Sequence, residues 1–199
     1  MTRWYFEKKK EHYYKQAKKA GYRARSAYKL KQIQKKFNIF RKGNYVVDLG
    51  AAPGGWSQVA KNLVGENGLI VGIDLLEIKP INGVSFIQGD MTKEESLNRI
   101  SELLDGSKVD IIISDMSPDI SGNYSIDQAR SVFLCQKALN AAEILLKEKG
   151  NFVCKIFSGE DLEDFFNEVK KKFRFVKIYS PPASRKSSSE VYIVAKDFY

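Results

Sequence analysis

The spacing of apolar residues along the chain alternates between the repeat of a strand and that of a helix. Short, mostly apolar runs predict buried strands, and apolar residues three or four positions apart predict amphipathic helices. Ala27, Leu30, Ile33 and Phe37 follow the helical spacing and predict a helix over 24–37. The same reasoning predicts strands over 45–49, 69–74, 84–88, 109–114, 150–157, 175–179 and 191–195, and helices over 56–63, 93–104, 126–147 and 162–173.

The order of these segments predicts the fold class. Strands alternate with helices along most of the chain, which is typical of an α/β architecture with a largely parallel sheet and helices on both faces. The last two strands are joined by the loop 180–189 without a helix, so we expect them to be antiparallel neighbours. The 199 residues suffice for one substantial core, and we expect a single globular domain with a seven-stranded sheet.

One predicted strand carries a charge in its middle. Residues 150–157, GNFVCKIF, follow a long helical pattern and have the composition of a buried strand, yet they include Lys155. A buried ammonium must find acidic partners or give up its proton, whereas a lysine near a strand end can extend its head to water. The strand alone leaves both explanations open.

The basic residues are unevenly distributed. Residues 1–42 hold 15 Lys and Arg against 2 acids, a net charge of +13, whereas residues 43–199 hold 18 against 22, a net charge of −4. Aromatic residues are interleaved with the basic ones: Trp4, Tyr5, Phe6, Tyr13, Tyr14, Tyr22 and Tyr28. Because cations neutralise phosphates and aromatic rings stack on bases, we predict that 1–42 is an RNA-binding extension containing a helix. The alternative is an arm that only adds solubility and packs some of its rings on the body.

Other features of the composition argue against several classes of protein. No apolar run approaches the roughly 20 residues that span a bilayer, and the first residues lack the apolar core of a signal peptide, so we expect a cytoplasmic location. Cys135 and Cys154 fall in apolar segments, which indicates reduced core thiols rather than a disulfide framework. His12 is the only histidine, which argues against a histidine-rich metal site and a Ser-His-Asp triad.

The strongest local signal is the segment 45–56, YVVDLGAAPGGW. It predicts a strand, a turn of small residues and a helix, and ligands bind at such a turn in an open α/β sheet. The turn allows close approach to its backbone, but the G-x-G-x-x-G spacing that binds a pyrophosphate is absent. Asp74 ends the next predicted strand, where a carboxylate can accept both hydroxyls of a ribose, and Asp90 ends the third, within reach of an adenine edge. One such acid could be an ordinary turn or capping residue, but two beside the glycine turn predict a pocket for an adenosine without phosphates.

Together these motifs resemble the FtsJ-type RNA 2′-O-methyltransferases, and among them the enzymes that methylate a uridine ribose of large-subunit ribosomal RNA. The resemblance rests on DLGAAPGGWSQ, SDMSP, VCKIF and SSEVYIVA, and with GYRARSAYKL it covers about the whole chain. It implies the S-adenosylmethionine-dependent, Rossmann-like methyltransferase fold over 43–199, with strand order 3-2-1-4-5-7-6 and an antiparallel seventh strand. It also implies a cofactor site formed by Gly54, Trp56, Asp74, Asp90 and Asp115.

The resemblance further implies a catalytic tetrad of Lys29, Asp115, Lys155 and Glu190, with Lys155 as the proton acceptor. Methyl transfer to a 2′-hydroxyl displaces a neutral leaving group and needs no metal, so the difficulty is loss of the hydroxyl proton. A lysine helps either as a neutral base or as a cation that stabilises the developing alkoxide. We expect Asp115 and Glu190 to hold Lys155 in place. Taken one by one, the other three could be a solvated helix charge, a turn residue and an edge-strand charge.

The resemblance therefore predicts 2′-O-methylation of a uridine in large-subunit ribosomal RNA by a monomeric enzyme, with the large ribosomal subunit or its precursor as partner. A tRNA anticodon-loop 2′-O-methyltransferase of the same family is one alternative, and an mRNA cap enzyme fits this short chain less well. A non-catalytic RNA-binding or ribosome assembly factor is an alternative of another class, although a pure binder has no need for four converging ionisable groups. The loop spacing disfavours a dehydrogenase.

Overall fold

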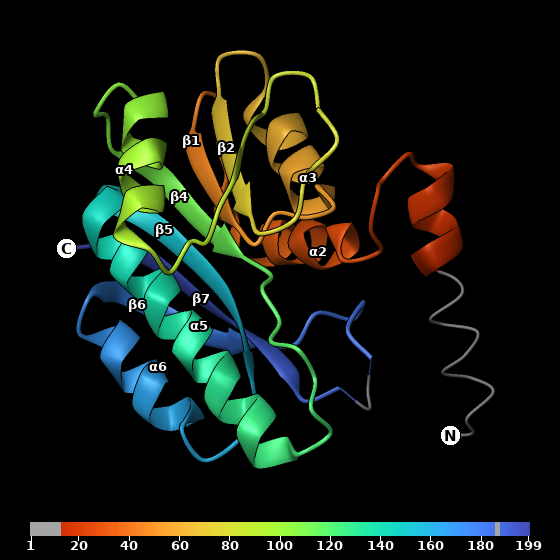
Figure 1. The fold of residues 1–199 in the computed structure, drawn as a ribbon, viewed down its shortest axis with the longest axis vertical. Coiled ribbons are helices and arrows are strands. Elements are labelled where there is room, and N and C mark those ends of the chain that lie inside the picture. Colours follow the sequence, from red (N-terminus) through yellow and green to blue (C-terminus); the bar gives the residue numbers. More distant parts are fainter. Residues whose placement is uncertain (1–12, 186–187) are drawn as a thin grey trace.

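A computed structural model of the chain describes residues 13–185 and 188–199. Trp4, Tyr5, Phe6 and His12 therefore lie outside the described residues. Residues 13–19 are helical, and a short connection joins them to the first labelled helix, α2. In Figure 1 this initial helix stands away from the sheet, on the side where α2 begins.

Strands and helices alternate along the chain in the predicted order (Figure 1). The helices are α2 (Ala27–Phe37), α3 (Gly55–Val64), α4 (Glu94–Leu103), α5 (Tyr124–Leu145) and α6 (Leu162–Lys170). The strands are β1 (Tyr45–Leu49), β2 (Leu69–Asp74), β3 (Ser85–Gln88), β4 (Val109–Ser114), β5 (Leu146–Phe157), β6 (Phe173–Tyr179) and β7 (Glu190–Phe198).

The strands form one seven-stranded sheet in the order β3-β2-β1-β4-β5-β7-β6. β1 pairs in parallel with both β2 and β4, and β4 pairs in parallel with β5. β7 lies between β5 and β6 and is antiparallel to both. The predicted strand order and the antiparallel last strand are therefore confirmed.

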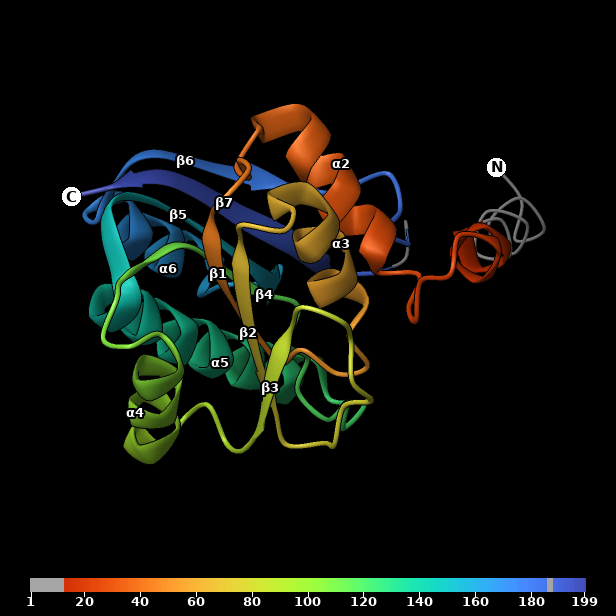
Figure 2. The same ribbon diagram turned by 90° about the horizontal axis from the view of Figure 1, so that it is seen from above.

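Helices cover both faces of the sheet, as expected for a parallel sheet whose strands are apolar on both sides. α2 and α3 lie on one face, and α4, α5 and α6 lie on the other (Figure 2). Neighbouring residues of β1 contribute to opposite layers, because Val46 packs with α2 and α3 while Val47 packs with α4 and α5.

α2 is part of the core despite its basic composition. Ala27, Leu30 and Ile33 are fully buried and belong to the same apolar cluster as Trp56 of α3 and Val194 of β7. The change of charge near residue 42 is therefore not accompanied by a break in packing. Whether residues 1–42 bind RNA stays a prediction.

Several predicted element boundaries differ from the structure. The helix predicted over 126–147 ends at Leu145, and β5 begins at Leu146 rather than at residue 150. After the buried Leu146, residues 147–149 of β5 are charged and exposed, and the register of β5 against β4 shifts between Val109 and Ile111, so the strand pattern is hidden there. Phe173, predicted to end α6, is instead a buried residue that begins β6.

The described residues contain no helix that is both long enough and apolar enough to cross a bilayer.

Candidate functional site

The turn between β1 and α3 adopts a backbone that requires glycine at two positions. Gly50 has φ +73°, and a Cβ there would lie 2.2 Å from Cγ of Met116. Gly54, at the N-cap of α3, has φ +104°. The turn thus brings bare backbone to the carboxyl ends of β1 and β4, where the sequence predicted a ligand.

Asp74 at the end of β2 fastens this turn. Its Oδ2 accepts a hydrogen bond from the Ala52 amide at 2.9 Å, and its Oδ1 accepts one from the Leu76 amide at 2.9 Å. Each carboxylate oxygen can accept two hydrogen bonds, so both retain capacity for a ligand hydroxyl. The predicted position of Asp74 beside the turn is therefore observed.

Asp90 lies after β3 in a tight turn before α4. Its Oδ1 accepts from the amide and the hydroxyl of Thr92, at 2.9 and 2.7 Å. The hydrogen bonds from the Thr92 side chain and backbone lower the pKa of Asp90, which keeps it ionised. Asp90 therefore serves as a turn residue, and none of these bonds engages its Oδ2.

Arg23 ties the segment before α2 to the glycine turn after β1, a contact that the sequence did not reveal. Its guanidinium donates to the carbonyl oxygens of Pro53, Lys79 and Pro80, in the turn and in the loop between β2 and β3. Its backbone amide donates to Oε1 of Gln58 on α3 at 2.9 Å. One side chain thus joins three loops that are far apart in sequence.

Lys155 is buried in β5, with a side chain only 7% exposed, and it has an acidic partner. Its Nζ donates to the backbone carbonyl of Asp115 at 2.7 Å and lies 3.4 Å from Oδ1 of the same residue. Lys29 of α2 forms an ion pair with Glu190 at the start of β7. The four predicted catalytic residues therefore make two lysine–carboxylate pairs. The expectation that Glu190 holds Lys155 is wrong in this respect, because the ion-pair partner of Glu190 is Lys29.

Tyr192 of β7 lies between the two pairs, and the sequence pattern did not single it out. It is fully buried, and its hydroxyl donates to Oδ1 of Asp115 at 2.6 Å. Its ring stacks on Trp56 with centroids 5.7 Å apart, and Nζ of Lys29 lies 5.6 Å from the ring centroid. The sequence could have placed Tyr192 near the site, because residues i and i+2 of a strand share a face and Tyr192 follows Glu190 by two positions.

Asp48 of β1 is a second buried group that the sequence did not single out. Its Oδ2 accepts from the Ser57 hydroxyl at 2.6 Å, whereas its buried Oδ1 has no hydrogen-bond partner. Burial raises the pKa of Asp48 to about 7, the Ser57 hydrogen bond lowers it, and the nearby charges of Asp115 and Asp74 add to the rise. Asp48 therefore leaves an unsatisfied acceptor directly beneath the glycine turn.

Two arginines bring positive charge near the tetrad. Burial lowers the pKa of Arg25, as does the charge of Arg185 in the loop between β6 and β7, while Glu190 and Asp115 raise it. Arg25 is therefore within electrostatic reach of Glu190 and Asp115, and Arg185 is within electrostatic reach of Arg25. Arg185 is exposed and Arg25 is partly exposed, so both can meet a charged ligand.

A narrow pocket of about 30 Å³ lies where these elements converge. It is lined by Ser26, Gly50, Ala51, Ala52, Pro53, Gly55, Trp56 and Asp115. A space of this size holds roughly one water, so any larger ligand would have to extend beyond it.

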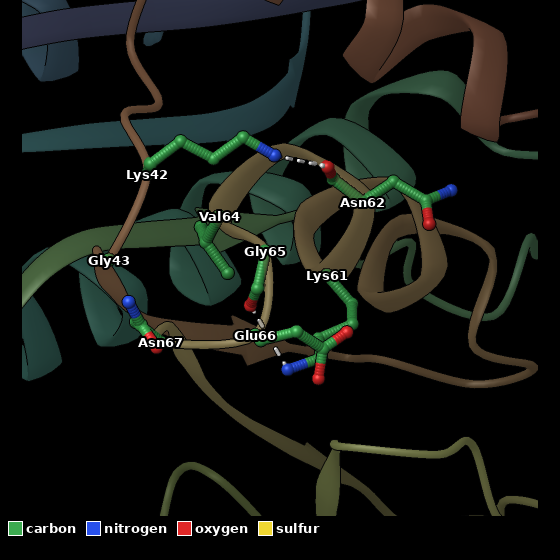
Figure 3. A pocket seen from close by; sticks show the side chains of 8 residues that line it. All are labelled: Lys42, Gly43, Lys61, Asn62, Val64, Gly65, Glu66 and Asn67. Carbon is green, nitrogen blue, oxygen red and sulfur yellow. Dashed lines mark hydrogen bonds between the residues drawn. The ribbon is translucent and has the colours of Figure 1, made fainter.

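A larger hollow, of about 600 Å³, lies at the opposite edge of the sheet, where β1 and β2 begin (Figure 3). There Lys42 and Lys61 donate to the carbonyls of Asn62 and Gly65 near the end of α3. The two amines thus donate to backbone carbonyls at the C-terminal end of α3. The hollow contains none of the predicted site residues. We therefore place the site at the narrow pocket. Within the described residues, no group of three or more His, Cys, Asp or Glu is arranged to hold a metal ion.

Comparisons with known proteins agree with the architecture. The sequence profile described as "FtsJ-like methyltransferase" matches residues 22–198. A protein named ribosomal RNA large subunit methyltransferase E from Methanothrix thermoacetophila is 53% identical over 94% of this chain and 72% of its own length. The proteins of that name from Methanocaldococcus jannaschii and Methanobrevibacter smithii are 51% and 49% identical, over 98% and 99% of this chain and 82% and 94% of their own lengths.

Solved structures extend the likeness to three dimensions. The crystal structure of a protein assigned as a ribosomal RNA methyltransferase from Plasmodium falciparum has a TM-score of 0.80 and 31% identity, over 89% of this chain and 98% of that chain. A structure from Clostridium thermocellum, with a TM-score of 0.58 and 20% identity over 85% of this chain and 97% of its own, supports the fold alone. By its sequence and its architecture, the chain belongs to the FtsJ-like methyltransferase family.

Proposed function

We propose that the chain catalyses S-adenosylmethionine-dependent 2′-O-methylation of a ribose, that of a uridine in large-subunit ribosomal RNA. The observation that carries the proposal is the meeting of two lysine–carboxylate pairs around Tyr192, next to the glycine turn after β1. Relatives that are 49–53% identical over nearly the whole chain are named for large-subunit ribosomal RNA, which supports this class of substrate.

The residues around the turn fit the proposed cofactor. S-Adenosylmethionine supplies a methyl group on a sulfonium centre. The carboxylate of Asp74 has unused acceptor capacity on both oxygens for the ribose hydroxyls, and Oδ2 of Asp90 is available to an adenine edge. The buried Oδ1 of Asp48 has no hydrogen-bond partner, so a water or a polar group of the ligand could satisfy it. Gly54 and Trp56 would line the approach along α3.

In the proposed reaction Lys155 acts on the 2′-hydroxyl. The bound cofactor would supply the methyl group to the 2′-oxygen, and Nζ of Lys155, as a neutral amine, would take the hydroxyl proton. Asp115 orients Lys155 through its backbone carbonyl and its Oδ1. Lys29, fixed by Glu190, adds positive charge that stabilises the developing oxyanion.

The surface near the site supports a nucleic acid as the substrate. Arg25 lies within electrostatic reach of Glu190 and Asp115, with Arg185 next to it in electrostatic terms, and both would neutralise phosphates beside the target ribose. On α2 and the segment before it, Nζ of Lys31 lies 5.4 Å from the ring of Tyr22 and 5.2 Å from that of Tyr28, a mixture of cation and aromatic groups that suits RNA.

The experiment that tests the proposal is methylation of separate RNA pools with methyl-labelled S-adenosylmethionine. We expect label in large-subunit ribosomal RNA, located at a uridine that becomes resistant to alkaline cleavage on its 3′ side. Label confined to tRNA would replace this proposal by the anticodon-loop enzyme. RNA binding without label in any pool would instead indicate a non-catalytic assembly factor.

A further inference from the structure

Tyr192 makes the shortest hydrogen bond to the Asp115 carboxylate. The tyrosine hydroxyl lies 2.6 Å from Oδ1 of Asp115, whereas Nζ of Lys155 lies 3.4 Å from the same atom. Charge-assisted N–H···O bonds are typically about 2.7–2.9 Å long, so the contact with Lys155 is too long to fix the carboxylate by itself. The position of Oδ1 is therefore set mainly by the tyrosine.

The tyrosine is itself held on several sides. It lies opposite Lys155 in the β5–β7 register and opposite Tyr179 in the β6–β7 register. Its ring stacks on Trp56, whose indole Nε1 donates to the carbonyl of Ser26 at 2.9 Å. A ring packed in this way has little freedom, so its hydroxyl is a fixed donor.

We propose that Tyr192 is a positioning residue of the methyl-transfer site, whose hydroxyl holds the Asp115 carboxylate in place against the amine of Lys155. The inference rests on the proposed function, because it gives Tyr192 a part in the same reaction. Burial and the charge of Asp115 raise the pKa of Tyr192 well above its usual value, so the hydroxyl keeps its proton throughout the working pH range.

A purely structural role would be served by the ring alone. Phenylalanine would fill the same space and preserve the stacking on Trp56, whereas only the hydroxyl reaches Asp115. Removing the hydroxyl oxygen therefore tests its effect on the Asp115 carboxylate without changing the packing of the ring. Tyr179 offers a matched control, because it faces Tyr192 on the neighbouring strand but packs against Phe37, with centroids 5.3 Å apart.

The test compares Tyr192→Phe with Tyr179→Phe in single-turnover methylation of large-subunit ribosomal RNA, at saturating cofactor and RNA. We expect Tyr192→Phe to slow the reaction at least ~10-fold, because small misplacements of reacting groups cost up to about 10²-fold. Its affinity for S-adenosylmethionine, measured by calorimetry, should change less than about threefold, since an apolar replacement of equal shape leaves the cofactor turn intact. Tyr179→Phe should match wild type in both measurements.

A double-mutant cycle shows whether the hydroxyl acts through Asp115. In an Asp115→Asn background, adding Tyr192→Phe should slow the residual reaction no further. An independent effect of the same size in both backgrounds would overturn the inference. If wild type is active and Tyr192→Phe reacts within twofold of the wild-type rate, the inference is also overturned. The proposed function would still stand in that case.

Two further measurements keep the inference testable if activity is absent or the variant is unstable. In a crystal structure of cofactor-free Tyr192→Phe, we expect the Asp115 carboxylate to turn away, so that its oxygens lie farther from Nζ of Lys155 than the present 3.4 Å. An unmoved carboxylate would contradict positioning even if wild type proves inactive on every RNA. If Tyr192→Phe does not fold, 3-fluorotyrosine at position 192 retains the ring and makes the hydroxyl a stronger donor. It should change the rate more than twofold, and an unchanged rate would overturn the inference.

Discussion

The amine of Lys155 is the reactive group of the proposed mechanism, and its burial is explained by its contacts with Asp115. Lys155→Met retains most of the side-chain volume but cannot accept or donate a proton. We predict a loss of at least ~10²-fold in single-turnover methylation, since a positioned proton acceptor contributes about 10²–10⁴-fold. Asp115 keeps its hydrogen bond from Tyr192, so the fold should survive.

The control for this substitution is Lys177→Met, which alters an exposed lysine of β6. Both variants should bind S-adenosylmethionine with the affinity of wild type in calorimetry. If the folded, cofactor-bound Lys155→Met enzyme keeps a rate within tenfold of wild type, Lys155 has no part in the chemistry.

The buried carboxyl of Asp48 makes the stability of the cofactor-free protein depend on pH. Its pKa is raised from 3.8 to about 7, so between these values the folded protein holds a proton that the unfolded chain releases. Stability should therefore fall as pH rises from about 4 to about 7, by on the order of 4 kcal/mol from this group, and then level off.

Asp48→Asn removes the titrating group and should flatten this part of the profile. The measurement is denaturant unfolding at half-unit steps of pH from 4 to 8 for wild type, Asp48→Asn and the control Asp105→Asn, which alters an exposed acid. Parallel profiles for wild type and Asp48→Asn would show that Asp48 does not titrate in this range.

At the level of elements, Arg23 couples the segment before α2 to the glycine turn, which is the proposed cofactor site. Arg23→Ala removes the hydrogen bonds to Pro53, Lys79 and Pro80, and leaves these loops without a common anchor. We predict that affinity for S-adenosylmethionine falls by about 10-fold, which corresponds to ~1.4 kcal/mol, while RNA affinity changes little. Calorimetry with the cofactor and filter binding with RNA measure the two effects.

Arg41→Ala is the matched control, because Arg41 is an exposed arginine in the connection between α2 and β1. It should leave cofactor affinity at the wild-type value. If Arg23→Ala instead weakens RNA binding and leaves cofactor affinity unchanged, Arg23 contacts an RNA phosphate. Its hydrogen bonds to the loops would then not contribute to cofactor binding.

The sequence predicted elements well where the hydrophobic repeat is uninterrupted, as in β1 and β4, and less well where packing overrides it. Residues 147–149 of β5 are charged and lie exposed beside a shifted register, so only the sheet reveals that they belong to a strand. Lys29 and Glu190 are 161 residues apart, and their pairing is a property of the fold. Asp115 and Lys155 could be placed by motif, but the hydrogen bond from Tyr192 needed the register of β7.

For the whole molecule, the separation of charge predicts how RNA is held. Removing residues 1–20 takes away 7 Lys and Arg and 2 acids. We predict weaker RNA binding and a smaller dependence on salt, by ~0.7 in the logarithmic slope for each phosphate of single-stranded RNA that the shortened protein no longer neutralises. Cofactor affinity should be unchanged, because Arg23, which anchors the glycine turn, remains.

The control changes exposed lysines on the opposite face, with Lys170→Gln and Lys171→Gln at the end of α6. RNA titrations between 50 and 200 mM salt compare the slopes. If the truncated protein keeps the wild-type salt dependence of RNA binding, residues 1–20 contribute to solubility only.

The place of β7 between β5 and β6 has a consequence for the timing of synthesis. Ribosomes make the chain from its N-terminus, so Lys29, Asp115 and Lys155 emerge well before Glu190 and Tyr192. Until β7 exists, β6 has no strand to pair with, because its partner in the sheet is β7. Insertion of this last strand therefore closes the sheet and delivers both remaining site residues in one step. In the proposed mechanism, a nascent chain that stops short of residue 190 still lacks the partner of Lys29 and the hydroxyl that holds Asp115, however well its first five strands have folded.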